Sequence, residues 1–289
     1  MSQMRRSPAL KIGHREFNAY EYALINPMQV DDSQWRDLPS EALNSPAFRV
    51  NPEVLPRLVA LNEMSDSQRE ELLARCARWM RNNQAPLLSA LMRSDCERVA
   101  LSAHLVSQMT ISFKQQKCWL RFHDPRVFAR LSWLLNDVQL RRLFGPITAW
   151  AWFDVWADNW HICQRPTRVE NAMPGRLEAE QWAALQRLPY LNRCLKQIKQ
   201  DEQISGDYHS LAKRLDTALH EAWSLGLKDR DDACLYALCI ERNGPRWPEV
   251  PRIREAIRQA EQGQQSLVRS LADDQHLSVH EIEPVTRYF

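Results

Sequence analysis

The residues best suited to chemistry in this 289-residue sequence are its eight histidines. His209 and His220 lie eleven positions apart, a spacing that returns to the same face of a helix after three turns. Zinc ligands in proteins usually come in closely spaced pairs, and neither histidine belongs to such a pair. The spacing therefore favours an ordinary helix surface, and we predict no metal site and no cofactor.

His123 and Asp124 form a second candidate, because a carboxylate beside an imidazole can orient it for proton transfer. Adjacent residues at the end of a strand point to opposite sides, however. Asp124 also stands directly before Pro125, and this dipeptide is typical of the start of a helix. We therefore interpret the pair as structural. An open pocket in which His123, Asp124 and His104 converge would instead support an enzyme.

Motifs for nucleophilic catalysis and for nucleotide binding are missing. The chain has seven glycines, and none lies between Gly13 and Gly145. Phosphate-binding loops and the G-x-S-x-G elbow both need glycine, so the first half of the chain contains neither. No cysteine has the flanking residues of a catalytic thiol. Nothing in these patterns supports an active site.

Composition excludes several other classes of protein. The formal net charge is +2 and the pI is about 8.2, so charge provides no argument for a nucleic-acid partner or for an anionic membrane. No apolar run approaches the roughly 18 residues that a membrane span requires. Seven cysteines without a C-x-x-C pair predict free thiols in a reducing compartment. We expect a cytoplasmic protein without a membrane or nucleic-acid partner.

The stretch from Cys118 to Asp154 contains the clearest structural signals. Residues 118–123 alternate between apolar and polar, as in a half-buried strand. Asp124 and Pro125 predict a helix that begins after them, and Asn136 begins a second one. Gly145 and Pro146 end that second helix, and alternation resumes at Ile147 in a further strand. The pattern is strand, helix, helix, strand.

Similar signals extend through the first half of the chain. Apolar runs predict strands at residues 20–25, 57–61 and 87–92, and residues 109–113 form a hairpin with the strand at Cys118. Ser67 with Glu70 and Ser94 with Glu97 each fit a capping box, which predicts a helix after each serine. From Leu177 to Leu271 the apolar residues recur at helical spacing throughout.

These patterns predict an α+β or α/β fold: a mixed-sheet amino-terminal lobe with flanking helices, followed by an all-helical carboxyl-terminal lobe. We divide the chain into a flexible leader (1–18), the α/β lobe (19–165), the helical lobe (177–271) and a tail (272–289). Residues 164–176 follow no periodicity and mark the boundary between the lobes.

Three tryptophans of the strand after Ile147 are candidates for binding a partner. Trp150, Trp152 and Trp156 share one face, and tryptophan is enriched at the energetic centres of protein interfaces. The alternative is that these indoles are buried in the core. Arg121 and Arg126 are also open to two interpretations: they stabilise the strand-to-helix corner by pairing with Asp124 or Asp154, or they face a partner.

The segments LRFHDPRVF (120–128) and LFGPITAW (143–150) resemble the signature of the type VI secretion adaptor family. Members of this family are effector chaperones encoded beside a VgrG spike gene, and they were long described as a conserved domain of unknown function. His104-Leu105, YALINP (22–27) and PRLVAL (56–61) fit other parts of the family pattern, and the match to the helical half is looser. Leu120, His123 and Phe128 depart from the usual residues but keep the strand-to-helix pattern.

The resemblance implies a cytoplasmic adaptor that binds one cognate effector toxin and loads it onto the VgrG spike, without catalysis. On this interpretation Asp124, Pro125, Gly145 and Pro146 are structural, and Trp150, Trp152, Trp156, Arg121 and Arg126 are candidates for contact with the effector. Two alternatives remain: a small-molecule-processing enzyme of unknown class, or a nucleic-acid-binding regulator.

Overall fold

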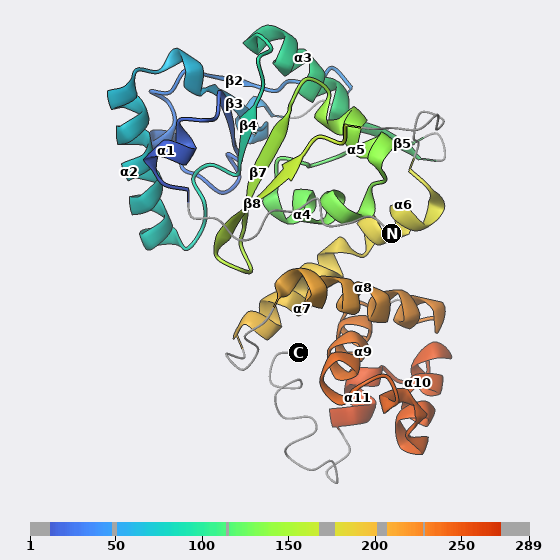
Figure 1. Ribbon diagram of the computed structural model, residues 1–289. Coiled ribbons are helices and arrows are strands. Elements are labelled where there is room, and N and C mark those ends of the chain that lie inside the picture. Colours follow the sequence, from blue (N-terminus) through green and yellow to red (C-terminus); the bar gives the residue numbers. More distant parts are fainter. Residues whose placement is uncertain are drawn as a thin grey trace. The chain divides into compact units, whose positions relative to one another are not determined.

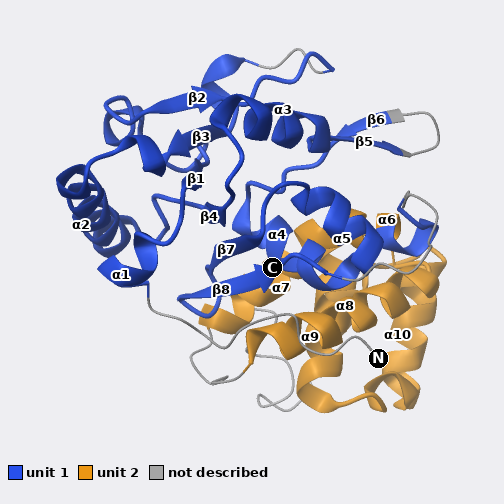
Figure 2. Ribbon diagram, turned by 45° about the horizontal axis from the view of Figure 1, so that its top comes forward, with its two compact units in different colours: residues 1–181 blue, residues 182–289 orange. Residues whose placement is uncertain are grey.

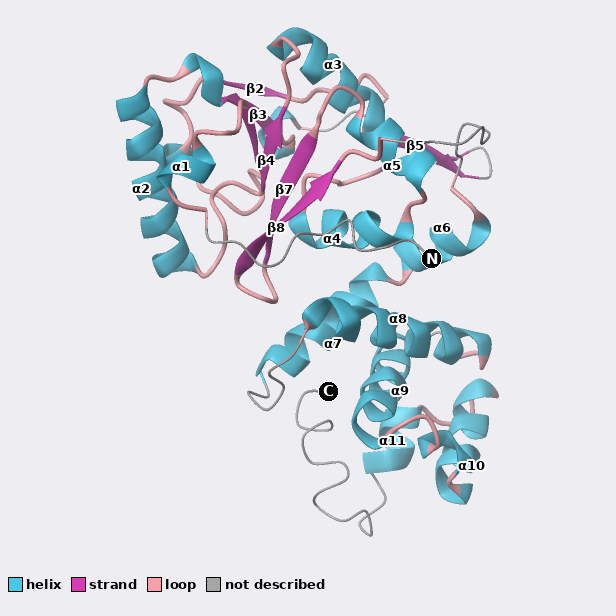
Figure 3. Ribbon diagram, viewed as in Figure 1, coloured by secondary structure: helices cyan, strands magenta, loops and turns pink. Residues whose placement is uncertain are grey.

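The computed structural model describes residues 12–47, 51–113, 116–167, 177–200, 207–227 and 229–272. The chain divides into two compact units, Met1–Gln181 and Trp182–Phe289 (Figure 2). Unit 1 contains a sheet with flanking helices, and unit 2 is helical (Figure 3). The predicted α+β architecture is therefore confirmed.

Unit 1 is built on a six-stranded sheet (Figure 1). In spatial order its strands are β2 (Ser40–Ala42), β3 (Arg57–Ala60), β1 (Tyr22–Ile25), β4 (Ala90–Arg93), β7 (Ala149–Asp154) and β8 (Asn159–Gln164). Every neighbouring pair in this sheet is antiparallel. The prediction of a mixed sheet was therefore wrong in this respect. The edge strand β2 is only three residues long and is flanked by Pro39 and Pro46.

Helices cover both faces of this sheet, which explains why β7 is buried along its whole length. On one face, Ala151 packs in a core cluster with Phe17 of α1 (His14–Phe17) and Leu72 of α2 (Asp66–Asn83). On the other face, Trp150 and Trp152 contact Phe128 of α4 (Pro125–Leu134). A strand covered on both faces has apolar residues at every position, as in Ala149–Phe153.

The remaining elements of unit 1 connect these layers. Helix α3 (Arg98–Gln108) leads into the hairpin of β5 (Thr110–Phe113) and β6 (Gln116–Trp119), which forms a second sheet of its own. The predicted strand at 118–123 therefore ends at Trp119, and a turn leads from it into α4. Helix α5 (Asp137–Phe144) follows, and short 3-10 helices occur at Asp32–Gln34, Pro52–Val54 and Leu61–Glu63.

Two predicted helix starts were wrong in position. Helix α2 begins after Ser65, which forms a capping box with Gln68, rather than after Ser67. Helix α3 begins after Glu97 without a side-chain cap. Ser94 is buried and uses its backbone N–H and its hydroxyl for bonds to Glu21 and to the Pro146 carbonyl. Ser94 thus connects segments that are distant in the sequence, and its local sequence does not reveal this role.

The expected flexible leader also needs correction, because α1 lies within it and the Phe17 side chain is 1% exposed. A buried phenylalanine ties residues 14–17 to the core. Residues 1–11 and 273–289 lie outside the described part of the chain, and so does most of the predicted boundary segment, residues 168–176.

Unit 2 is organised around α9 (Arg230–Asn243), whose residues 232–239 are all buried. Neighbouring helices are α7 (Leu188–Gln200), α8 (Tyr208–Ser224) and α11 (Leu267–Ala272), and η4 (Trp247–Glu249) leads into α10 (Pro251–Glu261). The unit boundary falls within α6 (Ala179–Gln186), because the Gln181 side chain bonds to Gln139 and to the Leu134 carbonyl of unit 1. None of the described helices is long and apolar enough to cross a lipid bilayer.

Candidate functional site

The strand-to-helix corner at Asp124 is held by one carboxylate. Asp124 Oδ1 accepts a hydrogen bond from the Arg126 backbone N–H at 3.0 Å, which caps α4. The Arg126 guanidinium donates to both carboxylate oxygens, at 2.9 and 2.6 Å. Burial raises the pKa of the Asp124 carboxyl, but the hydrogen bonds and charge of Arg126 outweigh it and leave the pKa below its ordinary value. Asp124 thus caps α4, Pro125 is the first residue of this helix, and Arg126, whose side chain is 36% exposed, pairs with Asp124.

His123 is also structural, because its side chain is 1% exposed and its ring lies among aromatic neighbours. The ring centroid is 5.8 Å from that of Trp119 and 6.2 Å from that of Phe122. Burial, and the positive charge of Arg121, lower the pKa of His123 to about 3. A neutral, enclosed imidazole does not meet the condition that we set for an enzyme, an open pocket shared with Asp124 and His104.

The Gly145 turn brings two parts of the family signature together. The backbone at Gly145 has φ +53°, and a Cβ placed there would lie 2.2 Å from the His104 ring. His104 Nε2 bonds to the Leu143 carbonyl at 3.0 Å, and Arg165 donates to the Gly145 carbonyl at 2.6 Å. Glycine is required here by both conformation and space. Gly145 thus packs directly against α3, and Pro146 ends the helix and accepts from Ser94.

The two central tryptophans are part of the core and are not a binding surface. Trp150 and Trp152 are both 0% exposed. Trp150 stacks on Phe128 with ring centroids 4.5 Å apart and an interplanar angle of 13°, and Trp152 lies 5.2 Å from the same ring. Buried side chains without accessible surface make no contact with a partner. Of the two interpretations, the structure supports the core for Trp150 and Trp152.

Trp156, Arg121 and Arg126 are the predicted contact residues that reach the surface. Trp156 is half-buried in the turn between β7 and β8, and its backbone N–H donates to Asp154 at 3.0 Å. Arg121 is exposed, with its guanidinium carbon 5.9 Å from the ring centroid of Trp119. The five candidates are therefore not equivalent: Trp150 and Trp152 are in the core, whereas Trp156, Arg121 and Arg126 are at least partly exposed.

Residues 22–142 match a known family model. Its description is Domain of unknown function (DUF4123), and the match begins at β1 and ends within α5. It includes the His123–Arg126 corner and His104, whereas Gly145 and the tryptophans of β7 follow it. No curated protein and no solved structure matches the chain.

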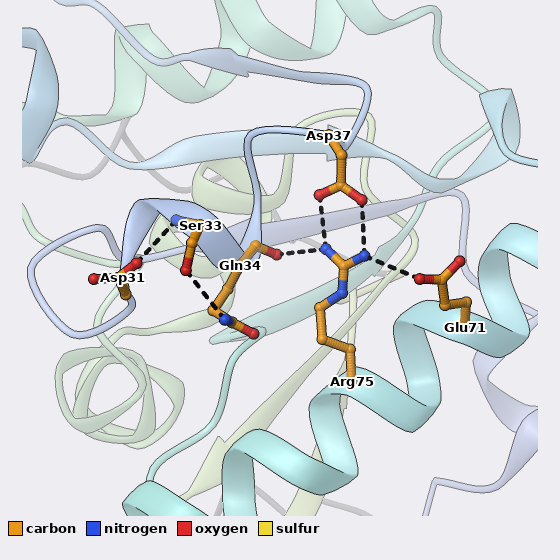
Figure 4. A network of polar contacts seen from close by, with 6 residues as sticks. All are labelled: Asp31, Ser33, Gln34, Asp37, Glu71 and Arg75. Carbon is orange, nitrogen blue, oxygen red and sulfur yellow. Dashed lines mark hydrogen bonds and ion pairs between the residues drawn. The ribbon is translucent and has the colours of Figure 1, made fainter.

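Within the DUF4123 match lies a polar network that the sequence did not reveal (Figure 4). Arg75 of α2 donates two hydrogen bonds of 2.7 Å to the Asp37 carboxylate. It also donates to the Gln34 carbonyl at 2.9 Å and to Glu71 at 3.4 Å. The hydrogen bonds from Arg75, and to a smaller extent its charge, lower the pKa of Asp37. The network attaches the loop at residues 31–38 to α2 and so holds this loop in position.

Two buried arginines were also missed by sequence reasoning, because no local pattern distinguishes them from exposed ones. Arg130 of the DUF4123 match is 2% exposed, and its guanidinium carbon lies 3.7 Å from the Trp133 ring centroid. In unit 2, Arg187 is 1% exposed and donates to Asp216 at 3.2 Å. Its Nη1 also lies 3.4 Å from His220 Nδ1. Arg130 lies within α4, and Arg187 lies between α6 and α7.

Metal ligation has no candidate among the residues that the structure describes, where no group of three or more His, Cys, Asp or Glu side chains could hold an ion. His209 and His220 both belong to α8, as their spacing predicts. All seven cysteines are free thiols, and Cys163, Cys194, Cys234 and Cys239 are buried. Burial raises the pKa of Cys239 to about 12, so this thiol is unreactive at neutral pH.

Proposed function

We propose that the protein is a non-catalytic adaptor that binds a cognate type VI secretion effector in the cytoplasm and loads it onto the VgrG spike. The observation that carries the proposal is the signature at residues 120–128 and 143–150. The DUF4123 match over residues 22–142 supports it, because the adaptor family has been described as a conserved domain of unknown function.

The geometry of the signature is compatible with such a role. The polar groups of the corner are engaged in capping and ion pairing, as the Asp124–Arg126 pair shows. His123 is enclosed, and His104 is held between Leu143 and Gly145. These side chains stabilise a scaffold, and a scaffold with two compact units offers surface for a client protein.

Co-expression with the products of the adjacent genes tests the proposal. The tagged chain should copurify with a toxin encoded beside it and remain bound through gel filtration. The toxin expressed alone should be less soluble or more harmful to the host cell. If no adjacent gene product forms a stable complex with the chain, the adaptor function is wrong.

A further inference from the structure

The hairpin of β5 and β6 presents an aromatic and basic surface. We use the name hairpin face for Lys117 and Trp119 of β6 together with Arg121, which lies two residues beyond the end of this strand. The Arg121 guanidinium carbon is 5.9 Å from the Trp119 ring centroid. Lys117 and Arg121 are exposed and Trp119 is half-buried, whereas Leu120 and Phe122 are buried. Tryptophan and arginine are the residue types that contribute most to binding energy at protein interfaces.

The chain segment that carries this surface contains more basic than acidic residues. Residues 98–136 contain six lysines or arginines and one acidic residue, Asp124, in a chain whose net charge is only +2. Asp124 is buried and paired with Arg126, and Arg98 is paired with Glu63. Among the described residues Lys117 and Arg121 form no ion pair, and neither α3 nor β5, which precede them, contains a carboxylate. The hairpin face therefore complements an acidic partner.

The backbone of the hairpin also favours an extended partner. Strands β5 and β6 pair only with each other in the described part of the chain, so each has one open edge. Figure 2 shows the hairpin extending beyond the end of α3, away from the six-stranded sheet. An isolated two-stranded hairpin is marginally stable, and a third strand would add main-chain hydrogen bonds to it.

We propose that the hairpin face binds an acidic, extended segment of the effector, with the Trp119 ring and the cations of Lys117 and Arg121 as its contact groups. This inference rests on the adaptor function proposed above and adds the surface and the chemistry of the contact. It places the client on the DUF4123 region and away from the buried tryptophans of β7.

Charge reversal tests the inference in the full chain. The K117E/R121E variant changes two exposed residues of the hairpin face. The matched control R78E/R81E makes the same change of charge at two exposed residues of α2. The affinity of each variant for the copurifying effector is measured by titration calorimetry at low and high salt, and circular dichroism checks that each variant is folded.

We expect K117E/R121E to weaken binding at least about 10-fold, while R78E/R81E binds like the wild type. High salt should weaken wild-type binding and affect K117E/R121E less. Amide hydrogen exchange of residues 110–119 should slow in the complex. If K117E/R121E bound the effector with wild-type affinity, the hairpin face would not be the contact surface. The proposed adaptor function would not be affected by that result.

Other outcomes also decide the question. Equal loss of binding in both variants would mean a non-specific charge effect and would overturn the inference. Binding of a random-sequence DNA oligonucleotide with the affinity of the effector would assign the face to nucleic acid instead. If the wild type binds no adjacent gene product, the adaptor function fails, and the hairpin face fails with it.

Discussion

At the residue scale, the signature is explained by contacts between side chains that lie far apart in the sequence. Gly145 is the clearest case, because the His104 ring occupies the space where a Cβ would be and the backbone has φ +53°. A histidine and a glycine separated by about 40 positions are thus one structural feature.

The Gly145→Ala variant should be destabilised by about 3 kcal/mol, because an alanine meets both the unfavourable φ and the imidazole. In a His104→Ala background the same change should cost at least about 1 kcal/mol less, since only the backbone strain remains. Urea denaturation of the four proteins in this cycle measures the coupling. Equal costs in the two backgrounds would show that His104 does not restrict position 145.

His123 predicts a pH dependence of stability. Its pKa of about 3 in the folded state lies below the value of about 6.5 in an unfolded chain, so between these values the unfolded state binds the additional proton. The stabilisation is complete above pH 6.5 and is lost as the pH falls towards 3. From pH 7 to pH 5 the loss from this one group is about 2 kcal/mol.

Replacing His123 with phenylalanine should remove that part of the acid sensitivity, because the aromatic packing stays and the titrating group does not. Denaturation midpoints at pH 7 and pH 5 should differ less for His123→Phe than for the wild type. The same pH response in both proteins would show that His123 is protonated in the folded state or is not enclosed.

At the element scale, β7 is a central strand whose tryptophans form the interior of the sheet's second face. Trp152→Ala should lower the free energy of unfolding by about 3–5 kcal/mol, as for large-to-small changes in a core. Trp156→Ala, in a half-buried turn, should cost about 1 kcal/mol. Thermal denaturation separates the two. A folded Trp152→Ala protein of wild-type stability would contradict the core assignment.

The corner shows how much of an element can be predicted from local sequence. Asp124-Pro125 and Asn136-Asp137 begin α4 and α5 as predicted, because an N-cap is made by side chains within three residues. Gly145 ends α5 as predicted because its backbone takes a positive φ, +53°, which glycine adopts readily. Ser65 and Ser67 both fit the start of α2, and the local pattern alone did not distinguish them.

Burial was harder to predict than secondary structure. Alternation in 147–156 correctly placed Trp150 and Trp152 on one face, but a period of two does not tell whether a helix covers that face. Phe128, which stacks on Trp150, lies 22 positions earlier on α4. The same limit applies to Phe17, Arg130 and Arg187, whose burial depends on packing partners distant in sequence.

At the scale of the whole molecule, the net charge of +2 conceals an uneven distribution. The basic stretch at residues 98–136 belongs to unit 1 and includes the hairpin face. A net charge near zero therefore did not exclude a charged binding surface, although it weakened the argument for nucleic acid. Of the five contact residues expected from the sequence, Arg121 belongs to the hairpin face that we propose, whereas Trp156 takes no part in that proposal.

The central claim is that the chain delivers one effector to the secretion spike, and deletion of its gene tests this most directly. In the deletion strain the adjacent toxin should be missing from the secreted fraction, while the spike protein is secreted at the wild-type level. Reintroducing the gene should restore the toxin. Secretion of the toxin at the wild-type level without the gene would contradict the adaptor function.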